Sequence, residues 1–71
     1  MKVKIIFDPD GDYGYPKGEI IEAQQLVDDY IENLNEVEDA NTISFLKKTE
    51  IEKAVDFVTE MWKIDYEFYN E

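Results

Sequence analysis

Residues 49–64 read TEIEKAVDFVTEMWKI and largely decide the second half of the fold. Their apolar side chains recur at helical spacing, at Ile51, Ala54, Val55, Phe57, Val58, Met61, Trp62 and Ile64. This spacing predicts an amphipathic helix with one broad face against a core. Thr49 and Glu52 have the spacing of a capping box, so we expect Thr49 to cap the start of the helix. We expect residues 65–71 to extend this helix or to fray from it.

A second helix is expected in the first half of the chain. The residues at helical spacing there are Ile20, Ala23, Leu26, Val27, Tyr30, Ile31 and Leu34. The pattern indicates roughly four turns with an apolar side that faces a core. No strong capping residue marks the start, so we place it between Lys17 and Glu19 and the end near Asn35.

The chain begins with a pattern that predicts a strand. Charged and apolar residues alternate through Lys2, Val3, Lys4, Ile5, Ile6 and Phe7, with Val3, Ile5 and Phe7 on one side. Residues 8–11 read Asp-Pro-Asp-Gly, which is turn chemistry because proline presets φ and aspartate caps its own backbone. Residues 12–15 are a candidate for a short returning strand of a hairpin.

Residues 42–47, TISFLK, are interpreted as a further strand with Ile43 and Phe45 on one face. Together these elements predict a two-layer α+β fold. Two or three short strands pack against two helices in the order β-(β)-α-β-α. Residues 1–71 are expected to form a single domain, because a chain of this length builds one small core.

The composition favours a folded protein without disulfides. Hydrophobic residues make up 44% of the chain and aromatic residues 14%, more than a disordered chain carries, and cysteine is absent. The first seven residues alternate in polarity and lead directly into a turn, so we expect neither a signal peptide nor a membrane helix. The expected location is the cytoplasm.

Charge is the strongest feature of the composition. Eighteen acids face seven lysines, which gives a net charge of −11. Residues 8–39 hold eleven acids and one lysine, a net −10 by subtraction. A field of this sign repels nucleic acid and anionic lipid and attracts basic surfaces. We therefore expect no direct nucleic-acid or membrane binding, and we expect a basic protein surface as the partner.

The residue types that most catalytic sites need are missing. The chain has no histidine and no cysteine, which removes the usual general base, the thiolate nucleophile and the soft-metal ligands. Gly11, Gly14 and Gly18 are spaced for turns, and no phosphate-binding loop is present. We expect a protein that binds and does not catalyse, with no cofactor.

Residues 8–19, DPDGDYGYPKGE, resemble the twelve-residue calcium loop of an EF-hand. Ligand positions 1, 3, 5 and 12 of such a loop fall on Asp8, Asp10, Asp12 and Glu19. Tyr13 stands where the loop needs glycine, Pro16 follows, and a strand precedes the segment in place of a helix. A calcium-binding module is one hypothesis; a tight hairpin turn with solvated acids is the other.

A row of acids is expected along the first helix, opposite its apolar side. The candidate partner-binding acids are Glu22, Asp28, Asp29, Glu32 and Glu36, prolonged by Glu38 and Asp39. From Glu22 to Glu36 a helix would rise about 21 Å, the length over which a protein follows several phosphates. Tyr13 and Tyr15 would anchor a partner or simply cover the sheet. The acids would serve that partner or simply keep a small protein in solution.

In composition the chain resembles phage-encoded inhibitors of host defence or DNA-handling enzymes. These proteins are small, acidic, rich in aromatic residues and free of cysteine, and some anti-CRISPR and anti-restriction examples are DNA mimics. The acidic and aromatic segment 65–70, DYEFYN, is of the same kind. The resemblance implies an inhibitor in the host cytoplasm whose carboxylates take the place of phosphates in a basic groove. An acidic antitoxin or assembly subunit is the alternative.

Overall fold

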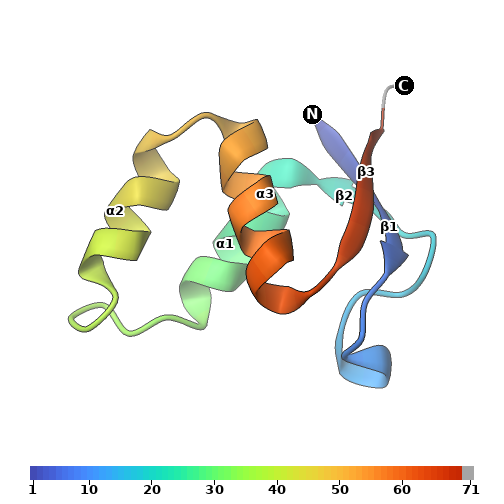
Figure 1. The fold of residues 1–71 in the computed structure, drawn as a ribbon, viewed down its shortest axis with the longest axis horizontal. Coiled ribbons are helices and arrows are strands. Elements are labelled where there is room, and N and C mark those ends of the chain that lie inside the picture. The colour runs from blue at the N-terminus through green and yellow to red at the C-terminus, as the bar shows by residue number, and fades with distance from the viewer. Residues whose placement is uncertain (70–71) are drawn as a thin grey trace.

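A computed structural model describes residues 1–69 and shows an α+β fold, which confirms the predicted class (Figure 1). The elements in chain order are β1 (Lys2–Phe7), a 3₁₀ turn η1 (Gly11–Tyr13), β2 (Ile20–Glu22), α1 (Ala23–Glu32), α2 (Ala40–Lys48), α3 (Ile51–Trp62) and β3 (Asp65–Tyr69). Helices α1 and α3 lie next to each other beside the strands, and α2 lies on the far side of them from the sheet.

The three strands form one antiparallel sheet in the order β2-β1-β3. The predicted first strand, β1, is therefore central. Val3 lies opposite Ile21 on one side and Phe68 on the other, so these three residues share a face of the sheet. A register shift falls between Ile5 and Phe7, where β1 holds one residue more than β3.

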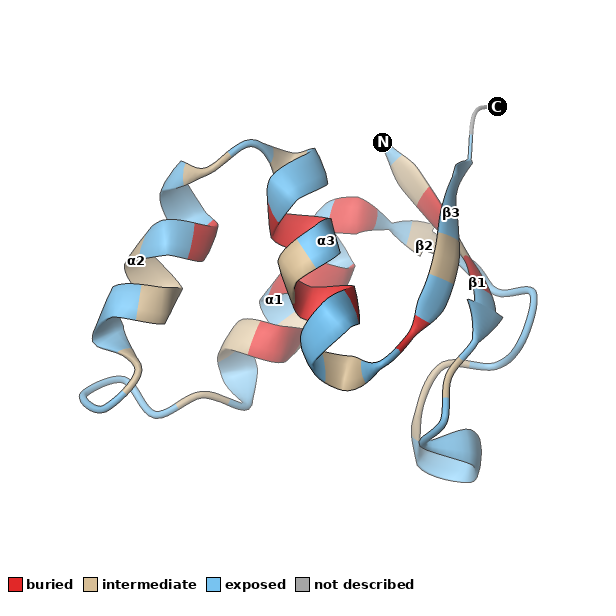
Figure 2. Ribbon diagram, viewed as in Figure 1, coloured by how far each residue is buried: buried red, intermediate tan, exposed pale blue. Residues whose placement is uncertain are grey.

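The core lies between the sheet and the facing sides of α1 and α3 (Figure 2). Its buried apolar residues are Val3, Ile5, Ala23, Leu26, Val27, Tyr30, Leu46, Ala54, Val55, Val58 and Ile64. The alternation in β1 correctly predicted that Val3 and Ile5 are buried, and the helical spacing in α3 did so for Ala54, Val55 and Val58. Phe7 and Met61, predicted on the same faces, are 54% and 56% exposed.

The last strand corrects the expectation for residues 65–71. Helix α3 ends at Trp62, and Lys63 follows with a left-handed φ of 60°, which reverses the chain. Residues 65–69 then pair with β1 as β3, so they neither extend the helix nor fray from it. Asn70 and Glu71 lie outside the described residues.

The strand predicted at residues 42–47 is wrong, because this segment lies inside α2. Ile43 and Leu46 are three residues apart on its inner side, and Leu46 is buried. Lys47 and Lys48 occupy the last turn, where positive charge is favourable beside the carbonyl end of the helix dipole. The short alternation of residues 42–45 matched a strand equally well in the sequence.

The predicted starts of two helices also change. Helix α1 begins at Ala23 because residues 20–22 pair with β1 as β2. The helix ends at Glu32. Helix α3 has Glu50 as its N-cap residue with no side-chain hydrogen bond, and Thr49 is the C-cap of α2. The predicted capping box at Thr49 is therefore not formed.

The returning strand predicted at residues 12–15 is wrong as well. This segment holds the end of the 3₁₀ turn and irregular chain, and the strand that pairs with β1 on this side is β2. Residues 8–19 therefore form a long connection between β1 and β2. This connection forms one wall of the site described next.

Candidate functional site

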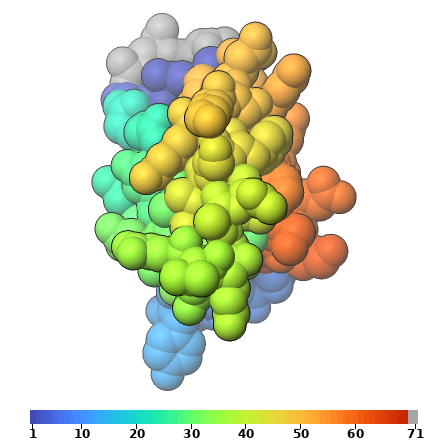
Figure 3. Space-filling model, turned by 90° about the vertical axis from the view of Figure 1, so that its left-hand side faces the viewer, coloured from blue at the N-terminus to red at the C-terminus, as the bar shows by residue number. Residues whose placement is uncertain are grey.

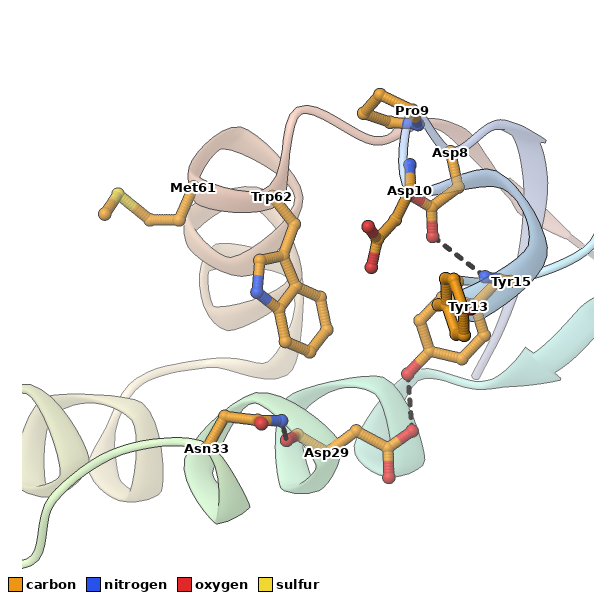
Figure 4. Close-up of a pocket in the computed structure, with 10 residues that line it drawn as sticks. Asp8, Pro9, Asp10, Tyr13, Tyr15, Asp29, Asn33, Met61 and Trp62 are labelled. Carbon is orange, nitrogen blue, oxygen red and sulfur yellow. Dashed lines mark hydrogen bonds between the residues drawn. The ribbon is translucent and has the colours of Figure 1, made fainter.

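A cleft of about 720 Å³ opens between the β1–β2 connection, α1 and the end of α3 (Figure 4). Six of the residues that line it are Asp10, Tyr13, Tyr15, Asp29, Asn33 and Trp62. We call it the aromatic cleft. Three aromatic rings and several carboxylates face one space, and none of its lining residues in the described part of the chain is a lysine.

Two of the aromatic walls are held in place by other rings. The Trp62 ring packs edge-on against Tyr30, with 5.1 Å between ring centroids, and Tyr30 is only 7% exposed. The ring centroids of Tyr15 and Trp62 are 6.4 Å apart, and the planes of the two rings meet at 47°. The tryptophan and the tyrosine thus form an angled corner whose inner part rests on the core.

The Tyr15 side chain joins the connection to α1. Its hydroxyl donates a hydrogen bond to the Asp29 carboxylate (Figure 4). Burial, and then this bond and the negative charges of Asp29, Asp8 and Glu19, raise the pKa of Tyr15 well above its usual range. The hydroxyl group therefore stays protonated and donates its hydrogen bond. The acceptor, the Asp29 carboxylate on α1, orients the Tyr15 ring.

Asp8 organises the connection from inside. Its carboxylate accepts the backbone N–H of Asp10 at 2.9 Å and that of Tyr15 at 2.8 Å. Gly14 passes so close that a Cβ at this position would collide with Oδ2 of Asp8. A glycine is needed here because any side chain would displace the carboxylate that ties the two ends of the turn together.

The proposed calcium ligands are only partly placed for a cation. Both oxygens of Asp8 accept backbone hydrogen bonds, and Asp10, Asp12 and Glu19 are exposed. Among residues 1–69 no group of three or more acids is arranged to hold a metal ion. The calcium hypothesis stays a prediction, and a melting experiment with millimolar calcium and with chelator tests it.

The predicted straight row of acids from Glu22 to Glu36 is wrong. Glu22 belongs to β2, and Glu36 lies in the connection between α1 and α2. Helix α1 has ten residues and rises only about 15 Å. Asp28, Asp29 and Glu32 are the acids of the row that the helix itself carries.

The remaining candidate acids differ in how free they are. Asp29 is half-buried and bonded to Tyr15, and Asp39 accepts the backbone N–H of Asn35 at 2.9 Å. These two carboxylates support the protein's own structure. The exposed candidates are Glu22, Asp28, Glu32, Glu36 and Glu38.

The two candidate tyrosines differ in the same way. Tyr13 is 93% exposed at the rim of the aromatic cleft, whereas Tyr15 is half-buried inside it. In the space-filling view the segment around residues 10–14 protrudes from the body of the molecule (Figure 3). Neither tyrosine is part of a strand of the sheet.

A second cleft, of about 680 Å³, lies between α1 and α2. Ile31, Leu34 and Ile43 supply apolar surface, and both signs of charge line it, from Glu32 and Glu36 and from Lys47 and Lys48. We call it the mixed cleft. The positive charges of its two lysines offset the negative charges of its two acids, whereas the described lining of the aromatic cleft carries negative charge alone.

Sequence reasoning missed Trp62 and Asn33 as site residues. Trp62 falls on the apolar face of its helix and was assigned to the core, where its inner edge does pack. Its position in the last turn of α3 was the available signal, because a large ring at a helix end reaches the surface. Asn33 follows α1 directly, and its side chain donates to the backbone carbonyl of Asp29 at 2.8 Å.

Within residues 1–69 no helix has the length and hydrophobicity to cross a membrane. Comparison of the chain with protein-family models, with curated proteins and with solved structures gives no match.

Proposed function

We propose that this protein is a non-catalytic binding protein that occupies a basic surface on a nucleic-acid-binding partner, as phage-type inhibitors of the anti-CRISPR and anti-restriction class do. One observation carries the proposal. Residues 8–39 have a net charge of −10, and five of their acids lie exposed on α1 and its two flanks. A surface of this sign attracts lysine- and arginine-lined grooves and speeds association with them.

The position of these acids lowers the stability of the protein. Glu32 lies in the last turn of α1, which contains no basic residue, so its charge opposes the helix dipole. Asp28 and Glu32 are four residues apart, so like charges stand on neighbouring turns. Each unfavourable placement costs a few tenths of a kcal/mol to about 1 kcal/mol. Acids retained at such positions are expected where a partner uses them.

The shape of the surface refines the DNA-mimic hypothesis. The exposed acids come from β2, α1 and the α1–α2 connection, so they do not form one straight row along a helix, and Lys47 and Lys48 line the mixed cleft with two of them, Glu32 and Glu36. Acids distributed in this way suit a groove in which arginines and lysines contact phosphates from several directions. Competition with DNA for the same groove is the expected consequence.

A pull-down from host lysate, eluted first with short duplex DNA and then with salt, tests the proposal. Recovery of a nucleic-acid enzyme that DNA releases is the expected result. A partner that salt releases and DNA does not would contradict mimicry and favour the antitoxin or assembly alternative.

A charge-reversal set locates the surface. The test variant carries Asp28→Lys, Glu32→Lys and Glu36→Lys, and it spares Asp29 because that carboxylate holds Tyr15. The control variant changes the net charge equally, with Glu50→Lys, Glu60→Lys and Asp65→Lys, three exposed acids outside residues 8–39. We expect the test variant to bind at least tenfold more weakly than the control. Equally weak binding of the two variants would show that binding depends on the net charge of the protein and not on this surface.

A further inference from the structure

We infer that the aromatic cleft receives one arginine side chain from the basic partner. This inference rests on the proposed function and adds the contact that would anchor the complex. It starts from the chemistry of the walls, which combine Tyr13, Tyr15 and Trp62 with carboxylates. Aromatic faces attract cations through the negative charge of their π-systems, and tryptophan does so most strongly.

The carboxylates of the cleft make it selective for positive charge. Asp8 and Asp29 already accept hydrogen bonds from the protein itself, yet both contribute negative charge. The Asp10 carboxylate accepts no hydrogen bond from the described residues, 1–69, and it points toward the space between Trp62 and the two tyrosines (Figure 4). One open acceptor therefore faces an aromatic space that none of the lysines among residues 1–69 lines.

A guanidinium group matches this arrangement better than the other biological cations. It is planar and weakly hydrated, so it stacks on a ring while its edge donates hydrogen bonds to a carboxylate. A quaternary ammonium group would satisfy the rings but has no donor for Asp10. An ammonium group has donors but is strongly hydrated, and it loses more when aromatic walls replace its water.

The walls are already in place before a partner arrives. Trp62 is fixed by the buried Tyr30, and Tyr15 is fixed by Asp29. Binding therefore spends little conformational entropy on ordering these rings. Tyr13, fully exposed at the rim, is the ring that gains most burial when a side chain enters. A central arginine surrounded by rings is the type of contact that dominates many protein interfaces.

An NMR titration of the full chain with the tripeptide acetyl-Gly-Arg-Gly-amide tests the inference. Trp62 is the single tryptophan, so its indole N–H signal reports on the cleft alone. We expect saturable shifts of this signal and of the Tyr13 and Asp10 amides. The citrulline analogue has the same shape without the charge, and it should produce no saturable shift. Equal shifts with citrulline, or shifts spread evenly over all acidic residues, would overturn the inference.

Lysine and trimethyl-lysine versions of the tripeptide test the choice of cation. Both should bind several-fold more weakly than the arginine peptide. Tighter binding of the trimethyl-lysine peptide would overturn the assignment to guanidinium in favour of a quaternary ammonium group.

Asp10→Asn and Asp12→Asn form a matched pair of variants. Both remove one exposed charge from the same turn, but only Asp10 lines the cleft. We expect Asp10→Asn to weaken the arginine peptide roughly tenfold, because a charged hydrogen bond is lost, and Asp12→Asn to change it little. Equal effects would overturn the role of Asp10. If the pull-down finds a partner whose binding ignores Asp10→Asn and Tyr13→Ala, the cleft inference fails while the proposed function stands.

Discussion

Helices α3 and α2 have twelve and nine residues, and they differ in how much of their surface is packed against the rest of the protein. Helix α3 buries Ala54, Val55, Val58 and Thr59 against α1 and the sheet. Helix α2 buries Leu46 alone, and less of its ribbon is coloured as buried than of α3 (Figure 2). Its Phe45 ring lies against the Phe57 ring of α3, with 5.7 Å between the ring centroids. Stability in such a molecule is uneven, with the weakly packed helix opening first.

This difference separates the two clefts. The aromatic cleft stands on α1 and α3, which belong to the well-packed half, and on an exposed turn that Asp8 ties down through two backbone hydrogen bonds. One side of the mixed cleft is α2, so its width follows a helix with little burial. A preorganised anchor is therefore expected in the first cleft and a deformable surface in the second.

The largest predicted effect compares two leucines. Leu26 of α1 is fully buried, and Leu46 of α2 is 4% exposed. We expect Leu26→Ala to lower the free energy of unfolding by about 2–5 kcal/mol. Leu46→Ala should cost less, about 1–2 kcal/mol, because α2 can shift to close the cavity. Urea denaturation of both variants measures the difference.

Hydrogen exchange of the wild-type protein provides an independent control for this comparison. Amides of α2 should exchange through local opening, and those of α3 only through global unfolding. Equal protection in the two helices, together with equal losses from the two leucine variants, would contradict the contrast.

The next predicted effect concerns Gly14, which positions the wall of the aromatic cleft. Gly14→Ala would push the Asp8 carboxylate away from its two backbone donors. We expect a loss of about 1–2 kcal/mol, the range for disrupting one or two hydrogen bonds, with the Trp62 fluorescence altered. Lys17→Ala, an exposed change in the same connection, is the control and should leave the stability and the fluorescence unchanged. A wild-type spectrum for Gly14→Ala would show that the turn tolerates the displacement.

The sequence predicted the parts of this fold that depend on local periodicity. Val3 and Ile5 alternate in β1, and the apolar side of α3 recurs over three turns, so both elements were recognisable. Helix α2 was missed because Ile43 and Phe45 alternate like a strand over a few residues. Strand β3 was missed because the residue that ends α3 in the left-handed conformation is Lys63, whereas glycine is the usual residue there and would have marked the end of the helix in the sequence.

The candidate site was predictable only in its ingredients. Tyr15 and Asp29 were both candidate partner residues, but their mutual hydrogen bond joins segments fourteen residues apart. The row from Glu22 to Glu36 is broken at one end by the pairing of β2 with β1, a long-range event that helical spacing cannot reveal, and at the other by the end of α1 at Glu32. Trp62 was assigned to the core, and one edge of its ring does pack against the buried Tyr30. A cleft arises from the meeting of segments, so composition can suggest its chemistry but not its position.

A smaller effect is predicted at alkaline pH, and it should act on the aromatic cleft and not on α2. Folding raises the pKa of Tyr15 above the ordinary tyrosine value of about 10. The protonated Tyr15 therefore contributes its full stabilisation below about pH 10, and this stabilisation is lost as the pH rises further. We expect the free energy of unfolding to fall more steeply above about pH 10 in the wild type than in Tyr15→Phe. Lysine titration is common to both proteins, so identical pH profiles would contradict the role of Tyr15.

The smallest predicted effect tests α1, the helix that the two clefts share. Glu32 lies in its last turn and lines the mixed cleft, where it opposes the helix dipole. Glu32→Gln should therefore raise the free energy of unfolding by about 0.3–1 kcal/mol, reduced by any attraction that Lys47 and Lys48 supply. Glu52→Gln is the matched change in the first turn of α3, where the charge is favourable, and it should lower stability by a similar amount. Thermal melting at low and high salt measures both, and both differences should shrink as salt screens the charges. If both variants are destabilised, Glu32 does not oppose the helix dipole, and its position gives no energetic reason to expect a partner.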